Sequence, residues 1–459
     1  MSLRKNLYNQ VAGKSRLKLS STQIIALMFL LIIALGTVLL SLPIASRSGQ
    51  SCGFFPALFT ATSSTCVTGL VLYDTWTQWS GFGQVVILCL IELGGLGFMT
   101  AASFVIFLLR KKVGVRQRMV MAQALSMSDM DSVVRLQKWV LVGSLLIQLT
   151  GALILFIHFL PIYGWENAAK WGVFHAVSAF CNAGFDIVGC IQPGASMIVF
   201  QNDPLVLLTL SALVILGGLG FFVWEEVVRV HSWKKFTVYT KLVLLMSGVL
   251  LLGGAIGFCL LEWNNPATLG NMSVADKLVN GFFQSVTVRT AGFAGLDQAA
   301  LTDGAKGLSM ALMLVGGSSG STAGGVKTVT VLVLMLFILS RARGKSSVCV
   351  FKRTIPASQV MDAMTITAIV VILAVFGAIF ISATSPVSFT DGLYEATSAL
   401  ATVGLSAVGT ANLSTAAQVL IIVYMYFGRV GVLTLSLGFL MGNQAEDRFR
   451  YANTNLLIG

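Results

Sequence analysis

The chain has 459 residues, of which 56% are hydrophobic and only 10% are charged, and its mean hydropathy is +0.85. Soluble domains carry roughly 25% charged residues, so the composition predicts an integral membrane protein and excludes a disordered chain, a collagen repeat and a secreted disulfide scaffold. The formal net charge is +12, and its distribution along the chain argues against nucleic-acid binding.

Eight apolar stretches are long enough to cross a bilayer as helices, which takes about 20 residues each. The first, Ile24 to Leu42, follows a basic segment but is longer than a typical signal-peptide core, so we expect it to be retained. The others lie near 82–109, 139–160, 204–228, 242–261, 308–340, 363–383 and 416–441. The eight predicted crossings form four pairs.

The basic residues are concentrated between the pairs. Of the 30 lysines and arginines, 23 lie in the segments 1–20, 110–138, 229–241, 341–353 and 448–450. All five segments can face the same side of the membrane, which is the positive-inside pattern. We therefore expect a multi-pass protein of a bacterial cell membrane with both termini in the cytoplasm.

A shorter stretch of moderate hydrophobicity lies within each pair. These stretches are Phe55 to Thr65, Trp171 to Cys181, Leu278 to Arg289 and Gly392 to Ala401. Each ends in a related string with a glycine, and Gly69, Gly184, Gly292 and Gly404 follow one another at intervals of 115, 108 and 112 residues. The second apolar stretch of each pair carries a Gly-rich string as well. The chain is therefore predicted to be a fourfold repeat of helix, re-entrant hairpin and helix.

Re-entrant hairpins leave backbone carbonyls unpaired at membrane depth, which is tolerated where they are buried or line a water-filled path. Rings of carbonyls can replace the hydration shell of a permeating cation, and glycine allows the backbone to aim them inward. Four hairpins around one axis predict a pore for a monovalent cation. The scattered cysteines and histidines indicate no zinc site.

On these motifs the sequence resembles the Trk/Ktr/HKT superfamily of potassium transporters, most of all the bacterial Ktr membrane subunit. The most specific strings are TVRTAGFAGLD at 287–297 and GGSSGSTAGGVKT at 316–328. The resemblance implies an all-α fold with eight crossings around one central pore. It also implies that Gly69, Gly184, Gly292 and Gly404 form the selectivity filter. Plant relatives that prefer sodium have serine at the first filter position, so Gly69 favours potassium.

The resemblance assigns the filter its neighbouring residues too, with K⁺ bound at the glycines. These neighbours are Val67, Thr68, Asn182, Ala183, Thr290, Ala291, Thr402 and Val403. Arg289 lies three residues before Gly292. A guanidinium in the lumen would repel potassium, so we expect Arg289 behind the filter, donating hydrogen bonds that hold backbone carbonyls.

Glycine in a helix interior costs roughly 1 kcal/mol relative to alanine, so 316–325 is not expected to be continuous helix. The resemblance implies that this segment is an intramembrane gate loop beneath the filter, although close helix packing is the alternative. Its residues are Gly316, Gly317, Ser318, Ser319, Gly320, Ser321, Thr322, Ala323, Gly324 and Gly325, with Lys327 at its end. The string does not meet the P-loop pattern, because Val326 separates Gly325 from Lys327.

Other charged residues leave alternatives open. Arg429 either faces the pore and restrains the gate loop, as the resemblance implies, or forms a buried structural pair, for example with Glu92. Lys327 either belongs to the gate or snorkels to the interface. The acidic residues expected outside either concentrate cations at the mouth or are merely solvated, and Asp391 could cap the fourth pore helix. They are Asp74, Asp186, Asp297, Asp303, Asp391 and Glu395.

We expect a cytoplasmic N-terminus at 1–21, four pore repeats at 22–110, 111–230, 231–345 and 346–447, and a C-terminal tail at 448–459. The Ktr resemblance implies a homodimer and a cytoplasmic ring of Rossmann-type subunits that bind ATP or ADP, with Na⁺ as a candidate activator. The basic segments 110–138 and 341–362 either dock this ring or contact anionic membrane lipids.

The leading hypothesis is passive, selective K⁺ uptake rather than enzymatic catalysis. A sodium or mixed-cation transporter of the same architecture is the first alternative. An intramembrane lipid-modifying enzyme is the second, but paired intramembrane carboxylates or a metal cluster that would support it are absent from the sequence pattern.

Overall fold

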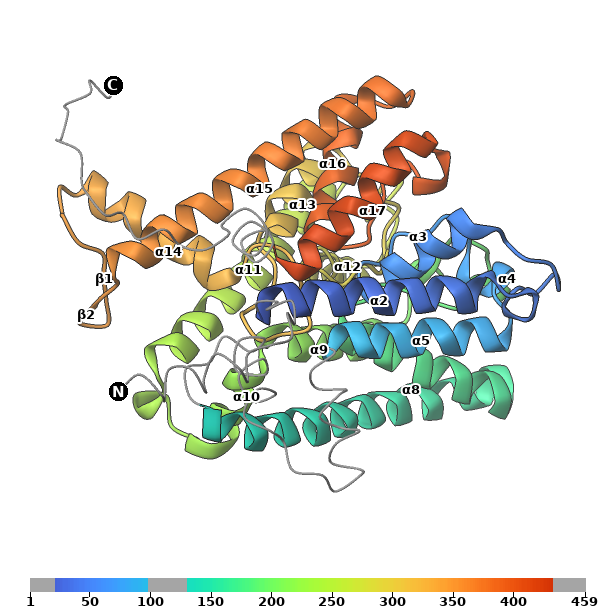
Figure 1. Cartoon of the computed structure of the whole chain (residues 1–459), viewed down its shortest axis with the longest axis horizontal. Helices are drawn as coiled ribbons and strands as arrows, with labels where there is room; N and C mark the ends of the chain where they lie inside the picture. The colour runs from blue at the N-terminus through green and yellow to red at the C-terminus, as the bar shows by residue number, and fades with distance from the viewer. Residues whose placement is uncertain (1–20, 98–129, 432–459) are drawn as a thin grey trace, which may run out of the picture.

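The computed structural model describes residues 21–97 and 130–431. These residues are mostly helical (Figure 1). The expected all-α fold needs one small correction, because β1 (Cys349–Val350) and β2 (Arg353–Thr354) pair as a short antiparallel hairpin.

Within residues 21–97 and 130–431, four long helices are apolar enough to cross a membrane. They contain the segments Gln23–Ser41, Lys138–Cys181, Val238–Glu262 and Ala357–Thr384, with mean hydropathies of 2.9, 2.4, 2.3 and 2.8. The helices are α2 (Ser21–Ser41), α8 (Met130–Cys181), α11 (Val238–Glu262) and α15 (Ala357–Thr384). Many of their large apolar side chains are exposed, as a lipid environment requires, for example Val38 and Leu260 at 61% and 77%.

Short helices lie over the stretches that the sequence predicts to be re-entrant. They are α3 (Phe54–Thr65), the end of α8, α12 (Val274–Thr287) and α16 (Phe389–Leu400). Gly164 has a φ of 76° and separates the last part of α8 from its membrane-crossing part. Ser273 and Ser388 cap the N-termini of α12 and α16 by accepting backbone N–H groups.

The second helix of each predicted pair is short or interrupted. These helices are α5 (Gly81–Gly95), α9 (Pro204–Leu219) with α10 (Phe221–Val230), α13 (Asp303–Leu314) with α14 (Thr328–Ala342), and α17 (Thr415–Val430). The predicted span near 204–228 consists of two helices rather than one straight helix, because the chain bends by 95° between α9 and α10. Residues 98–109 and 432–441 of two other expected spans lie outside the described residues.

The remaining described elements are short and connect these helices. They are η1 (Pro43–Ala45), α4 (Thr75–Gln78), η2 (Val188–Cys190), η3 (Ser196–Phe200), η4 (Trp233–Lys235) and η5 (Thr410–Asn412).

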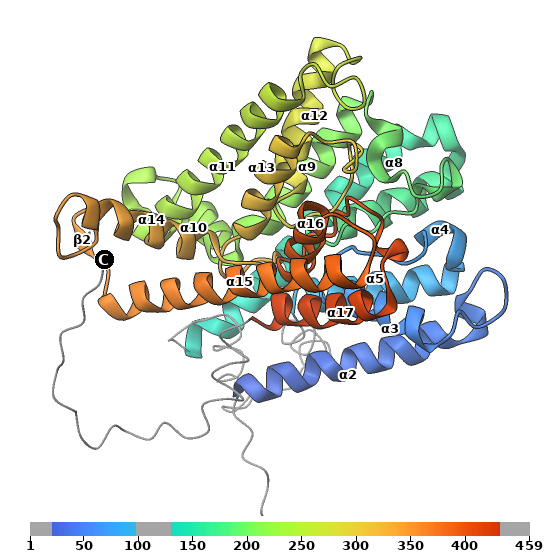
Figure 2. The ribbon, with the colours of Figure 1, turned by 90° about the horizontal axis from the view of Figure 1, so that it is seen from above.

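Contacts between elements close the chain into a ring. Helix α5 packs on α8, α9 on α12, α13 on α16, and α17 returns to α3 near the N-terminus. In the view from above, α2, α15 and α17 lie on one side and α9, α11 and α12 on the other (Figure 2). Because each contact joins one predicted repeat to the next, the four segments predicted to be re-entrant face a common centre.

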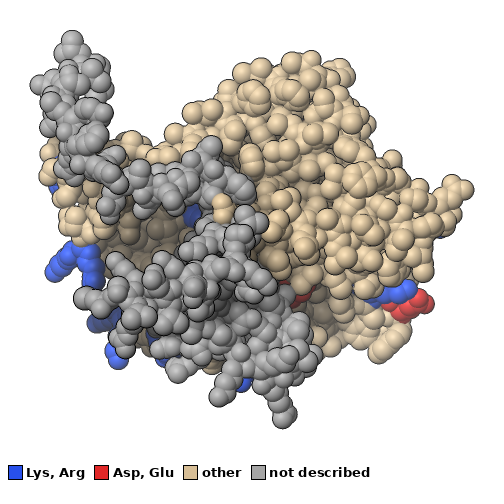
Figure 3. All heavy atoms as spheres, viewed as in Figure 1, with Lys and Arg blue, Asp and Glu red and all other residues tan. Residues whose placement is uncertain are grey.

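Basic side chains gather at one end of the visible face, where the hairpin and α10 lie, while most of that face is uncharged (Figure 3). Basic residues of the sequence in this region are Arg229, Lys234, Lys235, Arg341, Arg343, Lys345, Lys352 and Arg353.

Candidate functional site

Each short helix ends in a turn whose glycine has a positive φ. The angles at Gly69, Gly184, Gly292 and Gly404 are 93°, 69°, 82° and 101°. Residues with a side chain rarely adopt this region, whereas glycine does so at no steric cost. The glycines that repeat in the sequence therefore repeat a backbone geometry.

A second left-handed residue precedes each glycine by two positions. Val67, Asn182, Thr290 and Thr402 have φ angles of 56°, 60°, 72° and 52°. Such backbone costs on the order of 1–3 kcal/mol per residue and is found most often at functional sites. The sequence predicted these residues to belong to the site but gave no signal for their strain, because valine and threonine do not favour this conformation.

The four turns meet around one centre. A Cβ atom built on any of the four glycines would lie under 3.0 Å from the carbonyl oxygen that precedes the next repeat's glycine. The contacted oxygens belong to Ala183, Ala291, Val403 and Thr68, in the order of repeats two, three, four and one. The glycines thus form a closed ring with peptide carbonyls between them, and no side chain larger than hydrogen fits.

Hydroxyl groups at the ends of the short helices hold the turns. The hydroxyls of Ser63 and Ser398 each accept a hydrogen bond of 3.1 Å from the backbone N–H of the glycine six residues later. Ser178 and Thr287 instead donate at 2.7 Å to the carbonyls of Phe185 and Phe293. These residues were not predicted from the sequence to belong to the site. A serine six positions before three of the four glycines could have indicated their role.

Oxygen atoms dominate the chemistry of this centre. The hydroxyls of Thr65, Thr68 and Thr402 are buried and have no hydrogen-bond partner among the described residues. Among the same residues, no cluster of three His, Cys, Asp or Glu side chains could hold a metal ion. Carbonyl and hydroxyl oxygens without competing charged ligands suit a weakly held monovalent cation.

Glycines on the second helices allow them to pack directly beneath the turns. A Cβ on Gly94, Gly217 or Gly428 would collide with the carbonyl oxygen four residues before the ring glycine of its own repeat, on Thr65, Phe180 or Leu400. Three residues further on, Gly97, Gly220 and Gly431 have φ angles of 82°, 94° and 95°. The Gly-rich strings therefore permit close approach and then end or bend the helix.

In the third repeat, the loop 316–325 lies where the second helix of the other repeats ends or bends. The loop closes at its base, where the N–H of Gly316 donates to the Val326 carbonyl at 2.9 Å and the Thr328 hydroxyl donates to the Gly316 carbonyl at 2.9 Å. It is ordered by backbone bonds to the second repeat: the N–H of Ser318 donates to the Gly218 carbonyl and the N–H of Phe221 donates to the Gly320 carbonyl.

The loop also reaches the underside of the turns. The Thr322 hydroxyl donates to the carbonyl of Phe180 at 3.1 Å, near the end of the second short helix. A Cβ on Gly324 would meet the Thr402 side chain and the Ala401 carbonyl of the fourth repeat. The segment predicted as a gate therefore contacts the ring of turns from at least two repeats.

Arg429 connects this loop to the first repeat. Its guanidinium donates to the carbonyls of Thr322, Gly94 and Gly95, the last at 3.0 Å. The structure records no ion pair with Glu92 among the described residues; Glu92 instead accepts hydrogen bonds from Gln148 and Cys181. The Lys327 ammonium donates to the Ala323 carbonyl of the loop at 2.8 Å, so it points back to the loop.

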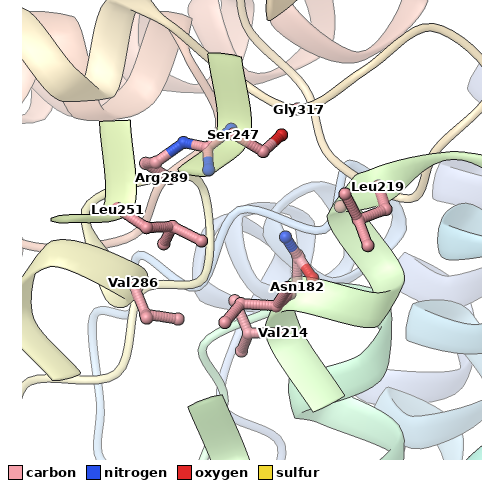
Figure 4. Close-up of a pocket in the computed structure, with 10 residues that line it drawn as sticks. Asn182, Val214, Leu219, Ser247, Leu251, Val286, Arg289 and Gly317 are labelled. Carbon is pink, nitrogen blue, oxygen red and sulfur yellow. The ribbon is translucent and has the colours of Figure 1, made fainter. Parts of the chain in front are cut away.

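Arg289 lies beside the ring and points into a small cavity. The cavity, with a volume of about 20 Å³, has room for one water molecule. Figure 4 shows the guanidinium of Arg289 and the amide of Asn182 directed into the space that Ser247 and Gly317 also line. The Arg289 Nε atom is buried and has no partner among the described residues. The bonds from Arg289 to filter carbonyls that the sequence analysis expects are not formed in this structure.

Several acidic residues predicted to lie outside are engaged in local structure. Asp74 caps α4 and accepts the Gly194 N–H at 3.1 Å, which joins repeats one and two. Asp391 pairs with Lys306 at 2.8 Å. The cap of α16 is Ser388 rather than Asp391, which lies in the first turn. Asp297 accepts a hydrogen bond from the N–H of Ala299, and Asp303 lies in the first turn of α13.

Glu395 is one of the acidic residues that the sequence predicts to lie on the outer side, but it is not exposed there. It is completely buried and accepts hydrogen bonds from Ser406, the Ala407 N–H and Thr410. It therefore holds the loop after the fourth turn. Asp186 remains close to the second turn, where burial, reinforced by the charge of Asp74, raises its pKa to about 6.

Comparison with known proteins identifies this arrangement. The family model described as "TrkH: Cation transport protein" matches residues 7–448. The chain is 39% identical to the potassium/sodium uptake protein NtpJ of Enterococcus hirae, over 97% of this chain and 98% of that protein. It is 38% identical to the Ktr system potassium uptake protein B of Bacillus subtilis, over 93% and 94% of the two chains.

A solved structure has the same fold. The potassium transporter TrkH from Vibrio parahaemolyticus superimposes with a TM-score of 0.71 at 17% identity, covering 93% of this chain and 86% of that one. The fold and the site define a multi-pass membrane protein that transports cations. The chain belongs to the TrkH family of cation transport proteins. It is thus a transporter and not an enzyme, which removes the lipid-modifying alternative.

Proposed function

We propose that the chain is the potassium-conducting subunit of a Ktr-like uptake system, in which K⁺ moves passively through one pore formed by four repeats and eight crossings. The observation that carries the proposal is the ring of Gly69, Gly184, Gly292 and Gly404 with a carbonyl oxygen between neighbours. These carbonyls and those of the adjoining left-handed residues replace the hydration shell of the ion. Relatives named as potassium uptake proteins support K⁺ as the transported ion.

A sodium or mixed-cation carrier is the second candidate, because the Enterococcus relative is named a potassium/sodium uptake protein. By the family resemblance, glycine rather than serine at the first ring position, Gly69, favours potassium.

The loop 316–325 acts as the gate in this proposal. It contacts the second and fourth turns from below, and Arg429 fastens it to α5. A charge at this depth raises the barrier for cations as long as it stays near the path. Opening then requires the bonds between Arg429 and the loop to break.

Regulation comes from other subunits in this proposal. Relatives named as components of a Ktr system support a partner, here a Rossmann-type ring that binds ATP or ADP on the cytoplasmic side of a homodimer. The basic end of the molecule, with the β1–β2 hairpin, faces the cytoplasm of the cell and offers the docking surface.

Uptake by bacterial cells that lack their own potassium uptake systems tests the proposal. Cells that produce this chain together with the partner ring should grow at low external K⁺ and should accumulate K⁺ in preference to Na⁺. Growth that responds to Na⁺ supply alone would favour the sodium alternative, and failure to take up either ion would reject the proposal.

A further inference from the structure

Glu92 is a carboxylate inside the apolar helix α5, next to the ring of turns. No basic side chain pairs with it in the part of the chain that the structure describes. Its oxygens accept hydrogen bonds of 3.0 and 3.2 Å from Nε2 of Gln148 on α8 and one of 3.2 Å from the thiol of Cys181. Arg429, which reaches the same helix end, donates to backbone carbonyls instead.

The thiol partner places Glu92 against the second turn. Cys181 is the last residue of α8, precedes the left-handed Asn182 and lies three residues before Gly184. A Cβ on Gly95 would lie 2.7 Å from the Cys181 sulfur, so that Gly95 and Glu92, three residues apart on α5, hold this side chain together. The strained turn thus begins at a residue whose side chain is fixed from another repeat.

In the described parts of the other repeats, this arrangement is not found. The corresponding residues, three before each glycine, are Cys66, Arg289 and Ala401. Cys66 is a buried thiol without a hydrogen bond to a carboxylate among the described residues. The chain therefore contains a natural comparison, one thiol with a carboxylate partner and one without, at equivalent positions.

The bond matters to both partners. A buried carboxylate is stable only when donors satisfy it, and a hydrogen bond to a charged group is stronger than one between neutral groups. Removing Glu92 takes away the acceptor of the Cys181 thiol, whereas removing Cys181 leaves Glu92 with Gln148 as its remaining donor. While Glu92 is in place, the Cys181 side chain has little freedom to move. Because the second turn begins directly after Cys181, the backbone of the turn is restricted as well.

We propose that Glu92 is a positioning residue for potassium selectivity: through its bond with Cys181 it fixes the turn that ends in Gly184, and with it the Ala183 carbonyl. The inference rests on the proposed function, because it assigns Glu92 to the filter that the proposal describes. Gln148, which donates to both carboxylate oxygens, orients Glu92 as well.

The test measures K⁺ uptake by liposomes containing the purified full-length protein, in competition with Na⁺. Glu92→Leu and Cys181→Ala should each lower the preference for K⁺ over Na⁺ about tenfold, the effect that one hydrogen bond to a charged group supports. The double variant should lose no more than either single variant, because both remove the same bond. Cys181→Ser, which keeps a donor, should restore most of the preference.

Two further variants test whether the change in preference comes from the loss of the hydrogen bond. The alternatives are a general loss of stability and the loss of the charge. Glu92→Gln keeps an acceptor without the charge and should retain part of the preference, even if Glu92→Leu does not fold. Cys66→Ala, the matched control, should leave the preference unchanged.

The result that overturns the inference is a wild-type preference for K⁺ that survives Glu92→Leu or Cys181→Ala. Equal losses in Cys66→Ala and Cys181→Ala, or a loss in Glu92→Gln as large as in Glu92→Leu, would also overturn it. A wild-type protein without any K⁺ preference would instead reject the proposed function.

Discussion

At Gly292 a side chain has no free space, since a Cβ would collide with the Val403 carbonyl and approach the Cα atoms of Gly184 and Gly404. Gly292→Ser should therefore displace the ring and reduce the preference for K⁺ over Na⁺ in competition assays. Because its φ of 82° also disfavours serine, we expect a loss of about 1–2 kcal/mol in stability. Gly253→Ser, at a position on α11 with nothing within 4 Å of a Cβ, is the control. Unchanged competition in Gly292→Ser would count against the filter assignment.

Asp186 gives the transporter a predicted pH dependence. Burial raises its pKa to about 6, so the carboxylate is charged above that pH and neutral below it. A negative charge beside the second turn attracts cations, and K⁺ uptake should fall as the outer pH drops through about 6. Asp186→Asn should remove this step, while Asp297→Asn should keep it. A step of the same size in Asp186→Asn would show that another group titrates.

The ring glycines could be predicted from the sequence because their spacing along the chain repeats. This spacing can be recognised without knowledge of the fold. The strain at Val67 and Thr402 could not, since it is imposed by the surroundings of the turns. The hydroxyl of Thr287 was equally hidden: it lies five residues before its glycine, whereas Ser63 lies six before. The sequence predicts Arg289 behind the filter but not the cavity that it faces, because the residues that line this cavity come from distant helices.

Among the elements, α9 depends on Gly217 to reach the second short helix. A Cβ there would overlap the carbonyl of Phe180, and backbone cannot yield as a flexible side chain does. Gly217→Ala should lower stability by about 2 kcal/mol or more, in the range of overpacked interiors. Gly248→Ala, on α11 with open space around it, should be neutral or gain up to about 1 kcal/mol. Thermal unfolding in detergent measures both, and similar melting temperatures would contradict the packing argument.

The loop 316–325, the proposed gate, is connected to the first repeat through Arg429, and a single change removes this connection. Arg429→Gln deletes the charge and the bonds to Thr322 and α5. K⁺ flux should therefore rise, as it should when 316–325 is deleted. Arg429→Lys keeps the charge but not the planar fork, so we expect an intermediate flux. A lower flux from a stable Arg429→Gln protein would show that Arg429 supports conduction instead of restraining it.

The ends of the helices could be predicted from the sequence where the polarity of the residues changes along the chain. They could not be predicted where packing between distant segments determines the end of a helix. The short helices α3 and α16 begin within three residues of their predicted starts at Phe55 and Gly392. The bend of 95° at Gly220 was not foreseen, because GGLG in an apolar stretch is equally compatible with a straight, closely packed helix. Only the contact of Gly217 with Phe180, and the loop bonded to Gly218, account for the bend.

At the scale of the molecule, the contact of α17 with α3 closes the four segments into a ring, joining residues more than 300 positions apart. The internal repeat in the sequence predicts that the four segments surround one centre. It does not predict which segments are neighbours in the ring.

The proposed regulatory ring should bind the basic end of the molecule. Lys352→Glu combined with Arg353→Glu reverses two charges in the exposed hairpin and should weaken co-purification with the ring, most clearly at low salt. Lys170→Glu is the control, since Lys170 lies in α8 beyond the bend at Gly164 and pairs with exposed Glu166 at 2.5 Å. Equal binding by the hairpin variant would assign this surface to lipid contact instead.

The central claim is that four glycine turns select potassium. It is tested most directly by measuring K⁺ and Na⁺ flux into liposomes that contain the purified protein, with and without the nucleotide-binding ring. We predict a flux that prefers K⁺ and that excess Na⁺ inhibits only weakly. Equal flux of both ions, or none even with the ring supplied, would contradict the account.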